Sequence, residues 1–391
     1  MPRPATVACG LTHPRVLTVS LLAMVTTSGP VLWAAQAGAR GWTSDSQRGA
    51  AYGFHASMPG YAATRLVELP ELAAELGVGA VLVKEESDRF GLPAFKILGA
   101  SWAVNQAISR HAGFDAPAAD LAELRDRAAA TPVTLVTATD GNHGRGLARM
   151  AAMLGLPARV YLPADTPSAV VAAIAGEGVE VIETDLIYDE VVRAAAASTT
   201  GRPDELLIQD TAWPGYEEIP TWIVRGYHTL FDEMDLQLGD RRPDLVAVPT
   251  GVGSLLQAAL EHYRAPGLTH RPAILAVEPV SAACVTVSLA AGERVSVDTS
   301  TPTIMAGLNC GSVSTIAWPA IRDGLDAGVG VTDDQARDAM ERLGGLGVNA
   351  GPCGAASLAG VRIALADADR RAALGVTGGS VVVLLSTEAR H

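Results

Sequence analysis

The chain has 391 residues, 49% of them hydrophobic and 18% charged, so it is long enough and apolar enough to fold around a buried core. Its 29 Lys and Arg against 42 Asp and Glu give a net charge of −13, whereas phosphate backbones are bound by basic surfaces. These values exclude a disordered chain and argue against a nucleic-acid partner.

The first 44 residues resemble a secretory signal weakly. They contain three arginines, no acidic residue, an apolar run at Val16–Met24 and the small-residue sequence Ala35-Gln36-Ala37. The run is shorter than the roughly 18 residues that a spanning helix needs, so we expect no membrane anchor. The alternatives are a disordered extension or a true start at Met24, and the segment is left outside the fold argument.

From Leu66 onward, short β-branched runs alternate with longer amphipathic stretches, which is typical of an α/β chain with a parallel sheet. The predicted strands are Ala80–Val83, Val133–Thr137, Arg159–Leu162, Val179–Ile182, Leu245–Pro249, Ala273–Val277 and Val381–Leu385. The predicted helices are Ile97–Arg110, Gly144–Leu154, Pro167–Ala175, Tyr188–Ala197, Ile219–Asp235, Ser254–Tyr263, Asp333–Leu343 and Pro352–Leu365. The stretch Phe114–Arg127 is interpreted as a solvated helix or an insertion.

Lys96 is the first candidate for chemistry. It lies between Phe95 and small or apolar residues at a predicted helix start. Desolvation and the positive end of the helix both disfavour an ammonium there and would lower its pKa, which suits Schiff-base chemistry. The alternative is an ordinary surface lysine with a partly buried stem.

Two glycine-rich turns each follow a predicted strand and open a predicted helix. The first is Thr139-Asp140-Gly141-Asn142-His143-Gly144-Arg145-Gly146, and the second is Thr250-Gly251-Val252-Gly253-Ser254. Backbone N–H groups at such junctions bind anions. Neither turn has the GxGxxG spacing of a dinucleotide site or the lysine of a P-loop, which argues against a nicotinamide oxidoreductase and against nucleotide hydrolysis.

In this order, the lysine, the GNHGRG turn, the GVGS turn and the Ser386-Thr387-Glu388 end of the last strand resemble the fold-type II pyridoxal phosphate enzymes. The resemblance covers residues 58–390. Three strings, Arg89-Phe90-Gly91-Leu92, residues 139–146 and Gln209-Asp210-Thr211-Ala212-Trp213, resemble diaminopropionate ammonia-lyases more than threonine dehydratases. The resemblance implies two α/β domains with mainly parallel sheets and the cofactor between them. The large domain would contain residues 45–96 and 216–391, and the small domain residues 97–215.

The resemblance also implies a role for each matching residue. Lys96 would bind pyridoxal 5′-phosphate covalently, and Asn142 would contact the cofactor's 3′-oxygen. Thr250, Gly251, Val252, Gly253 and Ser254 would hold the phosphate. Thr387, or failing that Ser386, would bond to the pyridine nitrogen; the choice stays open because Ala389 follows Glu388 where glycine is usual. The implied substrate contacts are Thr139, Asp140, Gly141, His143 and Asp210.

Asp140 and Asp210 are the residues from which the substrate is predicted. Related dehydratases have a serine at the position of Asp140, and a carboxylate suits a cationic β-ammonium better than a hydroxyl does. The resemblance implies that the two aspartates are acid/base groups on opposite faces of 2,3-diaminopropionate, which is eliminated to pyruvate and ammonia. For Asp210 the alternative is a turn cap.

Other functions stay open at this point. A serine or threonine dehydratase would not need Asp140, and a catalytically idle protein that binds pyridoxal phosphate would not need Lys96. The four cysteines, Cys9, Cys284, Cys310 and Cys353, form no CxxC motif and have no histidine at ligand spacing, so we expect no metal site and reduced thiols, with a Cys284–Cys310 disulfide as the alternative. A cytoplasmic homodimer of amino acid catabolism is expected.

Overall fold

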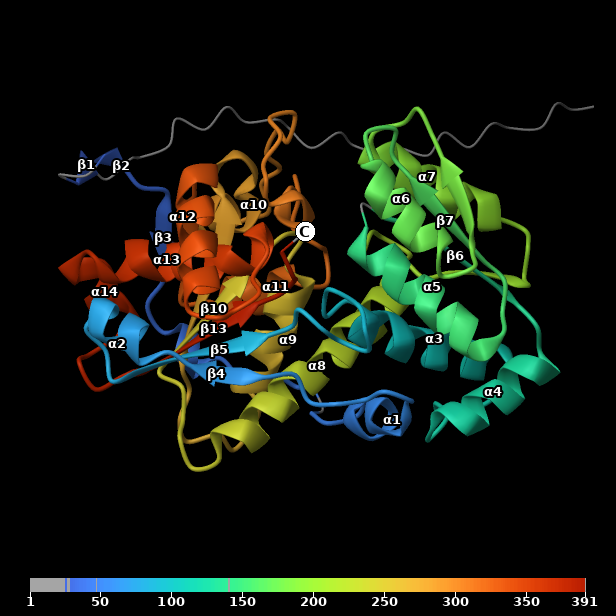
Figure 1. The fold of residues 1–391 in the computed structure, drawn as a ribbon, viewed down its shortest axis with the longest axis horizontal. Helices are drawn as coiled ribbons and strands as arrows, with labels where there is room; N and C mark the ends of the chain where they lie inside the picture. Colours follow the sequence, from blue (N-terminus) through green and yellow to red (C-terminus); the bar gives the residue numbers. More distant parts are fainter. Residues whose placement is uncertain (1–24, 27–28, 47, 140, 391) are drawn as a thin grey trace, which may run out of the picture.

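The fold contains two β-sheets of unequal size, both covered by helices (Figure 1). The computed structural model describes residues 25–26, 29–46, 48–139 and 141–390. In Figure 1 the larger sheet lies to the left and the smaller sheet to the right. Over the described residues, no helix combines the length and the hydropathy that crossing a membrane requires.

The larger sheet has seven strands in the order β3-β12-β11-β10-β13-β5-β4. Its five central strands are parallel, whereas β3 and β4 are antiparallel edges. All residues of β10 and β11 are buried, as expected of parallel strands with helices on both faces. The bounds are β3 Trp33–Ala35, β4 Leu66–Glu68, β5 Ala80–Glu85, β10 Leu245–Pro249, β11 Ala273–Pro279, β12 Ala327–Val331 and β13 Val381–Ser386.

Two hydrophobic cores lie on opposite faces of this sheet. Val246 and Val248 of β10 pack into the core that includes α3, α8 and α9, whereas Leu245 and Ala247 pack into the core that includes α2, α12 and α13. The helices around the sheet are α1 Tyr52–Ser57, α2 Pro70–Leu76, α8 Glu218–Leu238, α9 Ser254–Tyr263, α10 Cys284–Ala291, α11 Trp318–Gly324, α12 Asp333–Gly345, α13 Pro352–Leu365 and α14 Ala368–Leu374, with 3-10 turns at Ala39–Gly41, Val280–Ala282 and Ala306–Leu308.

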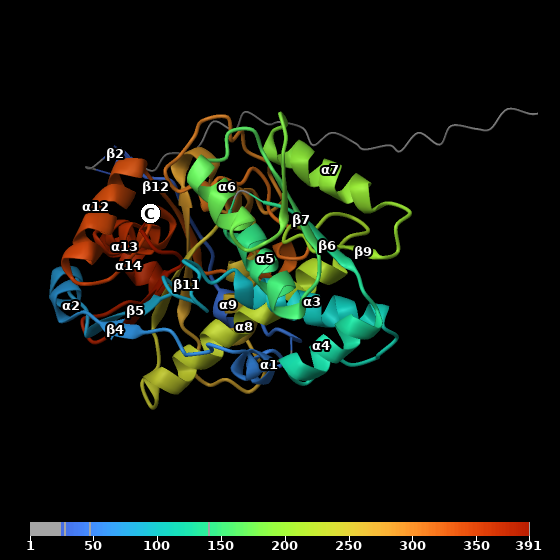
Figure 2. The same cartoon turned by 45° about the vertical axis from the view of Figure 1, so that its right-hand side comes forward.

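The smaller sheet has four parallel strands in the order β8-β7-β6-β9. Figure 2 shows α5 and α6 on one side of it and α7 on the other. The strands are β6 Thr134–Ala138, β7 Ala158–Leu162, β8 Glu180–Glu183 and β9 Glu205–Leu207. The helices are α3 Ile97–His111, α4 Leu121–Ala130, α5 Asn142–Leu154, α6 Ser168–Ala175 and α7 Tyr188–Thr199. The sequence stretch interpreted as a solvated helix or insertion therefore contains most of α4.

Helices α3 and α8 pack closely between the two sheets. A Cβ on Gly226 would lie 2.3 Å from the carbonyl oxygen of Leu98, and one on Gly99 would lie 2.5 Å from the ring of Tyr227. Both positions therefore require glycine, and α3, which begins directly after Lys96, is fixed against α8. Because α3 and α8 share one core, the division of the chain into domains at residues 97 and 215 stays a prediction.

The first 44 residues are expected to lie outside the fold, but the described part of this segment contributes a strand to the larger sheet. Strand β3 pairs with β12, with Trp33 opposite Val329. Arg40 Nε lies 2.8 Å from Asp326 Oδ1. An edge strand of three residues is too short to be recognised by its alternation. The apolar run Val16–Met24 lies outside the described residues; next to it, β1 Val25–Thr26 pairs with β2 Gly29–Pro30.

A buried ionic cluster fixes the chain between β5 and Lys96. Lys84 Nζ lies 2.7 Å from Glu233 Oε2, Arg89 Nη1 lies 2.6 Å from Glu233 Oε1, and Arg89 Nη2 lies 2.7 Å from Glu86 Oε1. None of the four side chains is more than 1% exposed. Burial raises the pKa of Glu233, but Arg89 and Lys84 outweigh it and lower that pKa to about 2. Glu233 of α8 therefore anchors the loop that carries Lys96.

Glu233→Gln is expected to lower the free energy of unfolding by about 3–5 kcal/mol, because it leaves Lys84 and Arg89 buried with one carboxylate fewer. Urea titration followed by circular dichroism measures the change. Glu75→Gln is the matched control. Glu75 also binds two arginines, Arg342 and Arg362, but its side chain is about one-third exposed. This substitution should therefore lower the free energy of unfolding by less than about 1 kcal/mol. Equal losses in the two variants would contradict the anchoring role.

Candidate active site

Lys96 and Asp210 lie side by side. Lys96 directly precedes α3, and Asp210 lies in the loop that follows β9. Lys96 Nζ donates to Asp210 Oδ2 at 2.7 Å, with the two side chains 26% and 10% exposed. The chain has only two lysines, and the other, Lys84, is fully buried in the ionic cluster. The structure therefore brings the predicted imine-forming amine and one predicted acid/base group together.

The charge of Asp210 depends on this contact. Burial raises the pKa of its carboxyl, but the Lys96 ammonium acts more strongly in the other direction, and the pKa is lowered to about 2. Gln209 Nε2 also donates to Asp210 Oδ1 at 3.4 Å. The group is therefore a carboxylate at neutral pH. Because Lys96 supplies most of the lowering, a Lys96 amine that is engaged elsewhere would leave Asp210 a stronger base.

His143 contributes a neutral ring to the site. Its Nε2 lies 2.8 Å from the carbonyl oxygen of Ile208, which can only accept, so Nε2 carries the proton. Burial lowers the pKa of the ring, which favours this neutral form. Nδ1 is then an acceptor, 4.0 Å from Asp210 Oδ2. His143 therefore lies beside Asp210, and its role as a substrate contact stays a prediction.

The GNHGRG turn connects β6 to α5. Thr139 is buried, and its Oγ1 accepts a hydrogen bond from Gly141 N at 2.9 Å, which shapes the turn. Asn142 is the first residue of α5. Asp140 lies outside the described residues, so its role as the second acid/base group stays a prediction.

The GVGS turn connects β10 to α9. A Cβ on Gly251 would lie 2.9 Å from Cys310 Sγ, and Gly253 has a φ of 100°, so both positions favour glycine. Ser254 opens α9, and its Oγ donates to the backbone oxygen of Asp210 at 3.3 Å. Thr250, which precedes the first glycine, is buried, and Val252 lies between the two glycines. This loop therefore contacts Asp210, the partner of Lys96, and presents a helix N-terminus suited to a phosphate.

The end of β13 supplies the remaining predicted contacts. Ser386 Oγ is buried, and no hydrogen-bond partner for it is found among the described residues. Thr387 is 5% exposed. A buried hydroxyl without a partner fits a ligand nitrogen and favours Ser386, whereas the family resemblance favours Thr387, so the choice between these two residues stays open.

Glu388 is a site residue that the sequence analysis gave no role. Its Oε2 accepts a hydrogen bond from Asn142 Nδ2 at 3.0 Å, and its Oε1 accepts one from Cys353 N at 3.1 Å. The Ser-Thr-Glu string marked the end of the strand, but Asn142 lies 246 positions away, and no local pattern connects the two.

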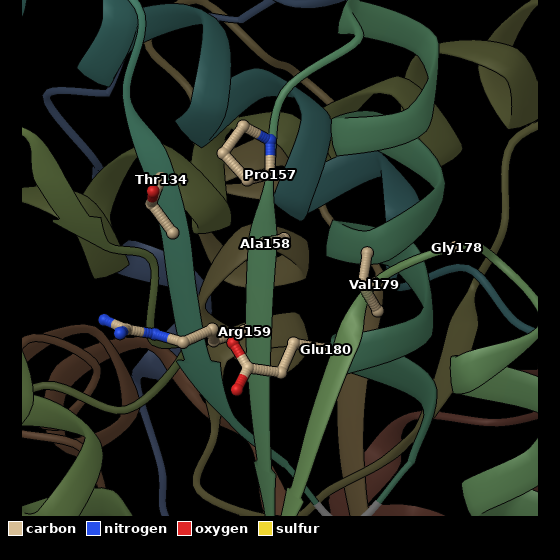
Figure 3. A pocket seen from close by; sticks show the side chains of 7 residues that line it. All are labelled: Thr134, Pro157, Ala158, Arg159, Gly178, Val179 and Glu180. Carbon is tan, nitrogen blue, oxygen red and sulfur yellow. The ribbon is translucent and has the colours of Figure 1, made fainter.

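Cys284 and Cys310 contact Gly251 of the GVGS turn or lie next to it, whereas the hollow in Figure 3 lies apart from this chemistry. Cys284 is a buried free thiol in this structure, so the alternative disulfide with Cys310 is not formed, and Cys9 lies outside the described residues. Over the described ranges, no group of three or more His, Cys, Asp or Glu is placed to hold a metal ion. The hollow, about 250 Å³, is lined by Thr134, Pro157, Ala158, Arg159, Gly178, Val179 and Glu180 (Figure 3).

That hollow lies at the amino ends of β6, β7 and β8, whereas every predicted site segment follows the carboxyl end of a parallel strand. Ligands of open α/β sheets bind at the carboxyl ends. A lysine, a carboxylate partner and a glycine-rich helix start at that edge define a site for a phosphate-bearing aldehyde cofactor that forms an imine. The chain belongs to the family of pyridoxal-phosphate dependent enzymes, whose model matches residues 58–388.

Within this family the chain is similar to diaminopropionate ammonia-lyases. It is 40% identical over 302 residues to the enzyme of that name from Salmonella typhimurium (73% of each chain) and 38% identical over 306 residues to that from Escherichia coli K12 (77% of this chain, 76% of the relative). A crystal structure of holo diaminopropionate ammonia lyase from Escherichia coli superposes with a TM-score of 0.83 at 34% identity, covering 91% of this chain and 93% of the other. The predicted family and fold type are confirmed.

Proposed function

We propose that this protein eliminates ammonia from 2,3-diaminopropionate with pyridoxal 5′-phosphate as cofactor. With one water, the substrate yields pyruvate and two molecules of ammonia. The contact of Lys96 with Asp210 carries the proposal, because it places an imine-forming amine within hydrogen-bond distance of a base. The names of the relatives support the substrate, and one Escherichia coli structure contains an "aminoacrylate-PLP azomethine reaction intermediate".

The residues present fit this cofactor. Lys96 would hold its aldehyde carbon, and the loop from Thr250 to Ser254 would hold its phosphate, since the loop's glycines leave no side chain between the ligand and the start of α9. Asn142 would meet the 3′-oxygen, and Thr387 or Ser386 the pyridine nitrogen. When bound, pyridoxal phosphate supplies the electron-withdrawing ring that acidifies the substrate's α-carbon.

The chain's own residues would then move the protons. Asp210, ionised and facing Lys96, would take the α-proton from one side, and Asp140 would act from the other. The β-amine must leave protonated, and a carboxylate attracts that ammonium more strongly than a neutral hydroxyl does. A hydroxyl from Thr387 or Ser386 at the pyridine nitrogen would leave the cofactor's ring a weaker electron sink, which would favour prompt loss of the β-substituent.

The experiment is an absorbance spectrum of the purified protein with pyridoxal phosphate, followed by pyruvate detection with D- and L-2,3-diaminopropionate, D- and L-serine and L-threonine. We expect a visible band from the lysine-bound cofactor and the highest kcat/KM with diaminopropionate. Turnover of serine or threonine in preference would assign a dehydratase instead. Such a relative exists: an L-threonine dehydratase from Mycobacterium tuberculosis is 32% identical over 271 residues, although the chain covers 58% of it. A cofactor band without turnover of any substrate would indicate an idle binding protein.

We further propose that the protein works in amino acid catabolism as a cytoplasmic homodimer. The resemblance to the family supports the dimer, and the buried thiol of Cys284 is compatible with a reducing compartment. Light scattering of the purified protein checks the mass of the assembly.

A further inference from the structure

We propose that Glu388 is a positioning residue that orients the amide of Asn142 toward the cofactor. This inference rests on the proposed contact of Asn142 with the cofactor's 3′-oxygen. Glu388 lies just after the end of β13, and its side chain contacts Asn142 at the start of α5.

The carboxylate of Glu388 settles which way the Asn142 amide faces. A carboxylate can only accept, so the amide must present Nδ2 to it, and this is the atom found 3.0 Å from Glu388 Oε2. Nδ2 carries two hydrogens, and only one is used in this bond. The second remains available to a bound acceptor, and the 3′-oxygen of pyridoxal phosphate is such an acceptor.

Glu388 is itself held from several sides. Its Oε1 accepts from Cys353 N in the first turn of α13, where the helix dipole favours a negative charge. Its backbone oxygen accepts from Gly351 N at 2.9 Å. A Cβ on Gly351 would lie 2.9 Å from Glu388 Cγ, so a glycine is needed there to make room for the Glu388 side chain. The side chain is 8% exposed as a residue, and its two carboxylate oxygens have different, fixed donors.

The same segment touches the chain just before Lys96. Glu388 forms an isolated bridge with Ala94, and Ala389 N donates to Pro93 O at 2.8 Å. Glu388 therefore contacts both regions that carry a predicted cofactor contact. Its side chain binds Asn142, and its backbone pairs with Ala94, two positions before Lys96. Loss of the carboxylate should act on the cofactor through Asn142, not only on the stability of the chain end.

The variant that tests this is Glu388→Gln. A glutamine has one acceptor oxygen, so it cannot satisfy the N–H groups of both Asn142 and Cys353. The NH₂ group of the glutamine then faces one of these two donors. Where it faces Asn142, the amide of Asn142 is expected to rotate and lose its fixed donor geometry. Because hydrogen bonds to charged groups are the stronger ones, we expect the Kd for pyridoxal phosphate to rise roughly tenfold and the absorption maximum of the bound cofactor to shift.

A double-mutant cycle separates positioning from a structural role. In the Asn142→Ala background, Glu388→Gln should change the Kd by less than about twofold, because the amide it orients is gone. The same fold-change in both backgrounds would overturn the proposal, as would an unchanged Kd and spectrum in the single variant. Glu341→Gln is the control: Glu341 binds Arg390 on the same chain end but is 66% exposed, and it should leave the Kd and the spectrum unchanged.

Melting temperatures of all variants are measured alongside. If Glu388→Gln does not fold, Glu388→Asp keeps the charge but is one methylene too short to reach both donors, and it should raise the Kd in the same direction. A wild-type protein that acquires no lysine-bound cofactor band overturns the proposed function itself. A normal wild-type band with no effect of either Glu388 variant overturns only this inference.

Discussion

Lys96→Ala is expected to yield a folded protein that makes no pyruvate from 2,3-diaminopropionate, with a loss of more than about 1,000-fold in kcat. No other amine can replace it: the only other lysine of the chain, Lys84, is fully buried, and its Nζ donates to Glu233, Gln237 and the backbone oxygen of Thr64. The visible band of the bound cofactor should disappear with the activity.

Two further measurements make this prediction specific. Borohydride reduction of the wild-type protein, followed by peptide mapping, should place the reduced cofactor on the peptide that contains Lys96. Lys96→Arg keeps a cation opposite Asp210 but cannot form an imine, so it should be as inactive as the alanine variant. Pyruvate formation at the wild-type rate by either variant, or label on the Lys84 peptide, would show that the cofactor assignment is wrong.

The central parallel strands and the helices that follow them could be predicted from the sequence because their patterns are local. The predicted bounds of β10, α9 and α13 agree with the structure. By contrast, β12 was missed because its sequence, Ala-Gly-Val-Gly-Val, contains two glycines, which are depleted in strands. Those glycines are needed by the packing: a Cβ on Gly328 would lie 2.5 Å from Thr286 Oγ1, and one on Gly330 3.0 Å from Leu32.

The site shows the same division between local and distant signals. The glycine-rich turns and Lys96 were found from short strings next to predicted helix starts. The charges at Lys84 and Arg89 gave no sign of burial, because the partner that neutralises them, Glu233, is 149 positions beyond Lys84 and 144 positions beyond Arg89. Glu388 was missed for the same physical reason: a polar side chain acquires its role only when the fold brings in its donors from α5 and α13.

Asp140→Asn and Asp210→Asn are expected to lose activity unequally toward the two enantiomers of 2,3-diaminopropionate. If the two carboxylates lie on opposite faces of the substrate, each α-proton can be taken only by the base on its own side. By the family resemblance we assign Asp140 to the D form and Asp210 to the L form. Loss of the base should cost roughly 100- to 10,000-fold in kcat/KM for the affected enantiomer.

Asparagine is the informative replacement because it keeps the shape of the side chain and removes only the base. For Asp210 it also removes the negative charge that lies 2.7 Å from Lys96 Nζ, so the cofactor band must be shown to persist before a loss is assigned to proton transfer. Each variant then provides the control for the other, since the enantiomer handled by the remaining aspartate should keep most of its rate. If both variants lost D and L turnover in equal proportion, the two-base mechanism would be wrong, and a single base or a purely structural role for one of the two aspartates would have to replace it.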